Sequence, residues 1–169
     1  IFILGRAKNN DILMGRLRQI LISEGFDYIG VSEEERVQRL EEIGKCLAPI
    51  TFDLSQKDLA ISLDDIERMK KNKIDHFFHI AAHTDFRDNQ SVIRKLEEVN
   101  IIGTDRLLSF ISTLNVGEII YTGSAYSCGN KSGFIKLDYT DLNQNFRNPY
   151  EKTKLVAEIN FKEFAEAHG

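Results

Sequence analysis

Short apolar segments alternate with segments of helical periodicity along almost the whole chain, and this alternation limits the possible folds. The apolar segments are typical of buried strands and lie at Ile1–Leu4, about Cys46–Phe52, about Ile74–Ala81 and Glu118–Thr122. Helical spacing marks Asp11–Leu21, Ser32 to about Ile43, a short stretch after Ser62, about Asn89–Leu114 and Pro149–Ala167. Strands that alternate with helices build a parallel sheet through right-handed crossovers. We therefore predict an α/β fold with a doubly wound parallel sheet.

Local signals mark where two of these helices begin and where one should end. Ser32 is followed three residues later by Glu35, and Ser62 by Asp65, which is the pattern of a helix N-cap. Gly44 is placed to stop the helix that begins after Ser32.

The composition restricts the classes of function. A chain of 169 residues with 42% hydrophobic and 28% charged residues suits one globular domain. The net charge of -4 includes no dense basic block, and no apolar run approaches the roughly 20 residues that span a bilayer, so we expect neither a nucleic-acid nor a membrane partner. Cys46 and Cys128 alone indicate a reducing cytoplasm. His76, His79 and His83 do not converge on one side of a strand, so we expect no metal site.

The most informative chemical pattern is Tyr150-x-x-x-Lys154 at the start of the last helix. Residues four apart share one helix face. A free phenol titrates near pH 10, so it needs a neighbouring cation to exchange protons at neutral pH, and Lys154 can supply it. Ser124 stands just past a strand, at the carboxyl edge where ligands of such sheets bind, and can donate a hydrogen bond to a carbonyl oxygen. Cys128 has no neighbouring cation that would make it a nucleophile.

Ser124 followed by Tyr150-x-x-x-Lys154 resembles the catalytic set of the extended short-chain dehydrogenases/reductases. The likeness is strongest to the thioester reductase domains and fatty acyl-CoA reductases, the male sterility type of NAD(P)-binding domain. It covers nearly the whole chain. The further similar segments are Phe52-Asp53-Leu54-Ser55, Leu59-Ala60-Ile61-Ser62, His79-Ile80-Ala81-Ala82 with Asp85-Phe86, and Asn100-Ile101-Ile102-Gly103-Thr104 with Leu107-Leu108.

The resemblance implies a role for each matching residue. Tyr150 would donate the proton, Lys154 would lower its pKa and hold the nicotinamide ribose, and Ser124 would orient the substrate carbonyl. The remaining cofactor-binding residues would be Asp53 and Leu54 beside the adenine, Ala81 and Ala82 along the cofactor, and Asn100 of the Asn-x-x-Gly-Thr helix.

The sequence departs from the family pattern in two places. Ile80 stands where family members commonly have Asn, and the glycine-rich turn that cradles the pyrophosphate is absent. That turn belongs before the strand at Ile1–Leu4. We therefore expect residues 1–169 to be a partial NADP(H)-binding Rossmann domain, incomplete at both ends, without its first strand and C-terminal substrate region. Such a fragment would expose two strand edges and should not fold stably alone.

Cofactor choice depends on the residues that follow the first expected strand. An acidic residue there favours a ribose 2'-hydroxyl, and a basic one favours a 2'-phosphate. Arg6 can fork two donors onto phosphate and Lys8 can add charge, so we expect NADP(H) rather than NAD(H).

Three functions compete on these residues. The leading interpretation is an NADPH-dependent reductase that transfers hydride to a carbonyl, most directly an acyl thioester on a carrier protein with a phosphopantetheinyl arm or on coenzyme A. The first alternative is a nucleotide-sugar epimerase or dehydratase of the same superfamily, which uses the same Ser, Tyr and Lys. The second is a non-catalytic NADP-binding scaffold. The sequence leaves the acyl chain and the oligomeric state open.

Overall fold

The computed structural model describes residues 1–25 and 32–168. The chain forms two compact units. The N-terminal unit consists of Ile1–Asp53 and Ala60–Asp65, and the C-terminal unit of Leu54–Leu59 and Ile66–Gly169.

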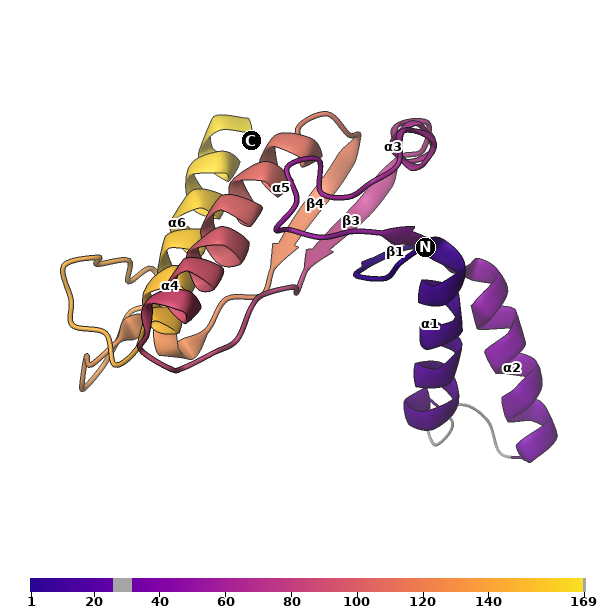
Figure 1. The fold of residues 1–169 in the computed structure, drawn as a ribbon, viewed down its shortest axis with the longest axis horizontal. Helices are drawn as coiled ribbons and strands as arrows, with labels where there is room; N and C mark the ends of the chain where they lie inside the picture. The colour runs from indigo at the N-terminus through magenta and orange to yellow at the C-terminus, as the bar shows by residue number, and fades with distance from the viewer. Residues whose placement is uncertain (26–31, 169) are drawn as a thin grey trace. The chain divides into compact units, whose positions relative to one another are not determined.

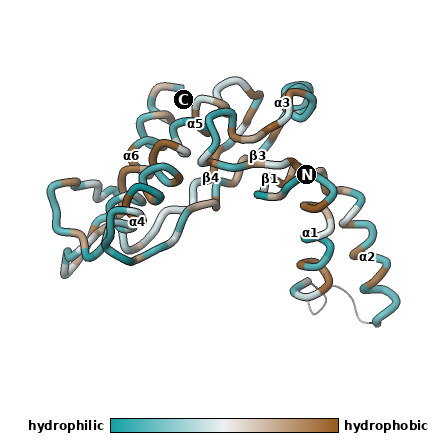
Figure 2. Tube along the Cα trace, in the orientation of Figure 1, coloured by the Kyte–Doolittle hydropathy of each residue, from teal (hydrophilic) through white to brown (hydrophobic). Residues whose placement is uncertain are grey.

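The N-terminal unit is built on one parallel strand pair. Strand β1 (Phe2–Gly5) pairs with β2 (Ala48–Thr51), and Phe2 lies opposite Ala48. Helix α1 (Asn10–Gly25) packs on β2, and α2 (Glu33–Cys46) lies beside α1 (Figure 1). Helix α2 is hydrophilic along most of its length (Figure 2), and Leu40 is its buried residue. The unit therefore has a small apolar core at the strand pair, where Ile50 is fully buried.

Helix α2 begins as predicted and ends later than predicted. The Ser32 side chain accepts a hydrogen bond from the Glu35 N–H at 3.2 Å, which confirms the N-cap. Gly44 lies inside the helix and does not stop it, and Cys46 belongs to the helix rather than to the next strand. The physical reason is Pro49, because a proline pushes the residue before it out of the helical region. A glycine inside a helix costs only about 1 kcal/mol, which packing overrides.

The C-terminal unit has the second parallel pair, β3 (Ile74–His79) and β4 (Val116–Tyr121), with His79 opposite Tyr121. Helix α6 (Pro149–His168) lies beside the helical stretch between the strands (Figure 1). The buried centre contains Leu96, Leu107 and Leu155. The remaining elements are α3 (Leu63–Lys70), α4 (Gln90–Leu96), a π-helical segment (Glu97–Ile102), α5 (Gly103–Ile111) and a 3-10 helix (Ala125–Cys128).

These strands confirm the α/β class and refine the single sheet that was predicted. The described strands form two parallel pairs, β1 with β2 and β3 with β4.

The N-cap predicted at Ser62 is also confirmed. The Ser62 hydroxyl accepts a hydrogen bond from the Asp65 N–H at 3.2 Å and donates one to the Asp65 carboxylate at 2.8 Å. Asp65 also accepts a hydrogen bond from the Asn10 side chain, at 3.1 Å. The start of α3 is thereby tied to the start of α1 within the N-terminal unit.

Candidate active site

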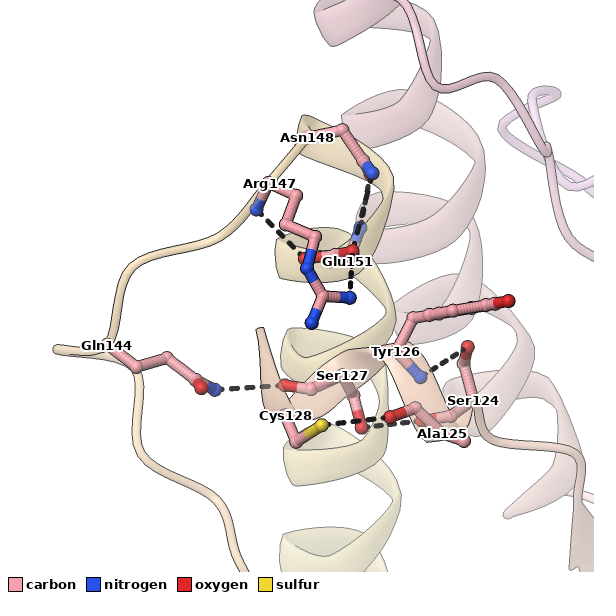
Figure 3. Close-up of polar contacts among 9 residues, drawn as sticks. All are labelled: Ser124, Ala125, Tyr126, Ser127, Cys128, Gln144, Arg147, Asn148 and Glu151. Carbon is pink, nitrogen blue, oxygen red and sulfur yellow. Dashed lines mark hydrogen bonds and ion pairs between the residues drawn. The ribbon is translucent and has the colours of Figure 1, made fainter. Parts of the chain in front are cut away.

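Ser124 lies three residues beyond the end of β4 and caps the 3-10 helix that follows. Its side chain accepts a hydrogen bond from the Tyr126 N–H at 3.2 Å, and its carbonyl accepts from the Ser127 hydroxyl at 2.7 Å (Figure 3). These bonds fix the backbone of Ser124 in an extended conformation. Because the Ser124 hydroxyl oxygen only accepts in these contacts, its own hydrogen stays available for a substrate oxygen.

Hydrogen bonds join the two ends of the segment between Ser124 and α6. The Gln144 amide donates to the Ser127 carbonyl at 2.9 Å (Figure 3), and the Asn130 N–H donates to the Asn145 carbonyl, also at 2.9 Å. Gly129 has a φ of +57°, and a Cβ there would lie 2.5 Å from the Asn145 carbonyl oxygen. Glycine is therefore required at this position by conformation and by space.

The first turn of α6 is fixed by a reciprocal cap. The Asn148 side chain accepts a hydrogen bond from the Glu151 N–H at 3.1 Å, and the buried Glu151 carboxylate accepts from the Arg147 N–H at 2.9 Å (Figure 3). Pro149 follows the cap at the first helical position, where its missing N–H has no cost. This turn carries Tyr150, so the cap sets the position of the Tyr150 backbone.

Lys154 is buried on the next turn of α6, with 4% of its surface exposed. Its ammonium donates a hydrogen bond to the Thr122 carbonyl at 2.9 Å and lies 4.5 Å from the centre of the Tyr121 ring. Burial lowers the pKa of Lys154 to about 8, and the charge of Glu158 partly opposes this effect. The bond to Thr122 joins α6 to the end of β4, two residues before Ser124.

Tyr150 is half-buried in the turn before Lys154. Its ring forms a T-shaped pair with the Phe86 ring, with 5.3 Å between centroids and 81° between planes. The Tyr150 hydroxyl makes no hydrogen bond to any residue in the described part of the chain. The structure thus brings Ser124, Tyr150 and Lys154 to adjoining ends of β4 and α6, with the two hydroxyl protons uncommitted.

An aromatic stack lies beneath the Lys154 backbone. The Tyr121 ring stacks on Phe161 at 4.4 Å, and its hydroxyl donates to the Lys154 carbonyl at 3.3 Å. His79 also stacks on Phe161, at 5.4 Å. Burial, together with the nearby Lys154 charge, lowers the pKa of His79 to about 4, so its ring is neutral at neutral pH. His79 is therefore a buried, packed histidine.

Asn100 is buried and its side chain bonds only within the protein. Its amide oxygen accepts from the His83 N–H at 2.7 Å, and its amide nitrogen donates to the His83 carbonyl at 3.0 Å and to Thr153 at 3.1 Å. The Thr153 hydroxyl in turn donates to the Tyr150 carbonyl at 3.0 Å. Asn100 therefore ties the loop after β3 to the start of α6, and its expected contact with a cofactor stays a prediction.

The other expected cofactor residues divide between the two units. Ala81 and Ala82 are exposed just past β3 in the C-terminal unit. Leu54 is buried, and its carbonyl accepts from Arg106 at 3.3 Å. Arg6, Lys8 and Asp53 belong to the N-terminal unit. Arg6 and Lys8 are exposed after β1, and Asp53 is half-buried after β2.

Sequence reasoning missed several residues at these positions. Arg16, on α1, donates a hydrogen bond to the Arg6 carbonyl and brings a third cation to the turn after β1. Glu151 was readable from the Asn148-x-x-Glu151 pattern, which is that of a capping box. Phe86 gave no signal for its ring contact with Tyr150, because that contact joins distant parts of the chain.

In residues 1–25 and 32–168, His, Cys, Asp and Glu side chains nowhere gather in a group of three that could hold a metal ion. The helices found there all fall short of the length and apolar character needed to span a membrane.

The fold and the site together define a Rossmann-like domain of the extended short-chain dehydrogenase/reductase type. A family model described as "Male sterility protein" matches residues 1–169, so the chain belongs to that family of NAD(P)-binding domains. This membership confirms the resemblance seen in the sequence.

The chain is similar to a curated protein and to solved structures. It is 29% identical to fatty acyl-CoA reductase 2 of Mus musculus over 141 residues, which are 82% of this chain and 25% of that protein. The terminal R domain of the myxalamid PKS-NRPS pathway has a TM-score of 0.76 at 20% identity, over 99% of this chain and 39% of that one. UDP-glucuronic acid 4-epimerase from Bacillus cereus, with NAD bound, has a TM-score of 0.59 at 20% identity, over 98% of this chain and 52% of that one.

Proposed function

We propose that residues 1–169 form part of an NADPH-dependent reductase that transfers hydride to the carbonyl of an acyl thioester, carried by coenzyme A or by a carrier protein. The observation that carries this proposal is the buried cation of Lys154 at the end of β4, one helical turn after Tyr150 on α6. The curated relative points the same way, since it is named a fatty acyl-CoA reductase.

Each site residue has one task in this reaction. A dinucleotide held at this site would supply the hydride for the carbonyl carbon. Tyr150 would give a proton to the carbonyl oxygen, the Lys154 ammonium would stabilise the phenolate that remains, and Ser124 would donate a hydrogen bond to the same oxygen as its negative charge develops. The thiohemiacetal formed in this way would then lose its thiol as the C–S bond breaks, which releases the aldehyde. Burial of Lys154 strengthens its electrostatic stabilisation of the phenolate, because water screens a buried charge less than an exposed one.

The residues present fit NADP(H). Ala81 and Ala82 are small and exposed at the carboxyl end of β3, which leaves room for a cofactor against the backbone. In the N-terminal unit, Arg6 and Lys8 are exposed, and Arg16 bonds beside them, which favours a 2'-phosphate. Cys46 and Cys128 are both free, which fits a protein of the reducing cytoplasm.

The strand pairing supports a domain that is larger than this chain. Among the described strands, β1 pairs only with β2 and β3 pairs only with β4. The chain also spans 25% of the curated relative that it matches. We propose that a strand with the glycine-rich turn, and a C-terminal region that shapes the substrate pocket, complete the domain in the full protein.

A second candidate function is a nucleotide-sugar epimerase or dehydratase. The structural similarity to an epimerase with NAD bound favours it, although at 20% identity that similarity shows the fold alone. A non-catalytic NADP-binding scaffold is the third candidate, and the retention of Tyr150 together with the buried Lys154 argues against it.

The experiment that separates these candidates uses the full-length protein. NADPH oxidation is followed with an acyl-coenzyme A thioester and, in parallel, with a UDP-hexuronic acid. Thioester-dependent oxidation that Tyr150→Phe lowers by roughly 100-fold or more supports the reductase. Conversion of the sugar without net cofactor consumption supports the epimerase, and bound cofactor with no conversion of either substrate supports the scaffold.

A further inference from the structure

The loop after β3 presents a large apolar side chain to the proposed proton donor. Phe86 is 55% exposed, so its side chain is not part of the buried core. Its described ring partner is Tyr150, which it meets edge-on at 5.3 Å and 81°. Aromatic pairs prefer this T-shaped arrangement, in which the positive edge of one ring faces the negative face of the other.

The loop that carries Phe86 is held in place on both sides of the ring. Asp85 accepts a forked pair of bonds from the Arg87 guanidinium, at 3.0 Å and 2.6 Å, and one from the Arg87 N–H at 3.0 Å. Three residues earlier than Phe86, the His83 backbone exchanges two hydrogen bonds with the Asn100 side chain. Phe86 is thus presented to Tyr150 from an ordered segment.

The same network reaches the backbone of Tyr150. Asn100 donates to Thr153 at 3.1 Å, and the Thr153 hydroxyl donates to the Tyr150 carbonyl at 3.0 Å. Asn100 therefore sets the spacing between the Phe86 loop and the first turn of α6. The Tyr150 hydroxyl has no polar partner among the described residues. The Phe86 ring is therefore the described contact that can hold the Tyr150 side chain in place.

We infer that Phe86 is a positioning residue that holds the Tyr150 ring in the rotamer needed for proton transfer. The inference rests on the proposed function for its catalytic consequence. A phenol on a helix start has several allowed rotamers, and an edge-on ring beside it restricts that choice.

The test compares three variants of the full-length protein: Phe86→Ala, the conservative Phe86→Tyr, and Phe134→Ala. Phe134 is a matched control because it is also a phenylalanine on a loop of the same unit and is 92% exposed. Activity is measured with the substrate that the unmodified protein turns over. We expect Phe86→Ala to lower kcat about 3- to 10-fold with little change in KM, which is the loss of one aromatic pair. Phe86→Tyr should restore kcat, and Phe134→Ala should leave it unchanged.

A double-mutant cycle and a spectroscopic readout separate positioning from a structural role. If Phe86 acts through Tyr150, Phe86→Ala has no further effect on the residual rate of Tyr150→Phe. With 3-fluorotyrosine incorporated and the resonance assigned through Tyr150→Phe, Phe86→Ala should shift the fluorine signal of Tyr150, whereas Phe134→Ala should not.

An unshifted Tyr150 signal, an unchanged kcat, or an equal loss in the Tyr150→Phe background would overturn the inference. A protein that turns over neither substrate would overturn the proposed function instead. In that case the fluorine shift alone decides whether Phe86 holds the Tyr150 ring.

Discussion

Replacing Lys154 by Met should make the protein more stable at neutral pH while it removes the activity. The physical reason is that the Lys154 ammonium is buried with only one carbonyl partner and one ring beside it. Burial lowers its pKa from 10.5 to about 8. Each tenfold change in proton affinity corresponds to about 1.4 kcal/mol, so the buried charge costs roughly 3 kcal/mol below pH 8. Loss of the hydrogen bond to the Thr122 carbonyl should offset about 1 kcal/mol of the stability that removal of the charge adds.

The expected net effect of Lys154→Met at pH 7 is therefore about 2 kcal/mol of added stability. The sign of its pH dependence follows from proton binding. Between pH 8 and 10.5 the unfolded chain holds the Lys154 proton and the folded protein has lost it, so the unmodified protein gains stability as pH rises. The advantage of the variant should shrink over this window and be absent above pH 10.5.

Urea denaturation of the full-length protein at pH 7 and at pH 10 measures both effects. Lys152→Met is the matched control, since Lys152 is exposed on the same helix and should change stability little at either pH. Destabilisation of Lys154→Met at pH 7, or an advantage that does not shrink by pH 10, would refute the reasoning. A gain in stability joined to a loss of activity is what a residue retained for function should show.

Three further predictions concern the packing that supports the site. Gly103→Ala should lower the free energy of unfolding by about 1–2 kcal/mol, because a Cβ there would lie 2.7 Å from the Leu54 Cβ. Gly15→Ala is the control and should not destabilise the protein, because a Cβ at Gly15 meets open space. Equal effects of the two substitutions in urea denaturation would contradict this prediction. As the pH falls from 6.5 to 4, the unfolded chain binds a proton at His79 whereas the buried ring in the folded protein stays neutral, so His79 should contribute up to about 3 kcal/mol to the loss of stability. His79→Phe should flatten this part of the plot of unfolding free energy against pH. An unchanged plot would exclude His79 as the source of the loss. Ala60→Gly should raise the thermal midpoint, because Ala60 has a φ of +55° that costs an alanine about 1 kcal/mol, and a lower midpoint would count against it.

The sequence predicted the features that local chemistry determines. Helical spacing and the serine caps at Ser32 and Ser62 placed α2 and α3 correctly at their starts. The predicted end of α2 was wrong, because Gly44 does not stop the helix, which continues to Cys46 and ends ahead of Pro49.

Contacts between distant segments were beyond sequence reasoning. The spacing of Tyr150 and Lys154 predicted a shared helix face, but it did not reveal that Lys154 would bond to a strand carbonyl rather than be solvated. Nor did it reveal the Phe86 ring against Tyr150, or the side chain of Asn100 between the loop and α6. Residue type and spacing were thus enough to propose Ser124, Tyr150 and Lys154 as site residues. The contacts that hold these residues in place depend on tertiary packing, which the sequence does not reveal.

The most direct test of the central claim is to follow the hydride itself. The full-length protein is incubated with an acyl-coenzyme A thioester and NADPH that carries deuterium at the reactive carbon of the nicotinamide, and the product is examined by mass spectrometry. The account predicts deuterium on the former thioester carbon of the released aldehyde or alcohol, and labelled product formed roughly 100-fold or more slowly by Tyr150→Phe. Unlabelled product, or labelled product at an undiminished rate from Tyr150→Phe, would contradict it.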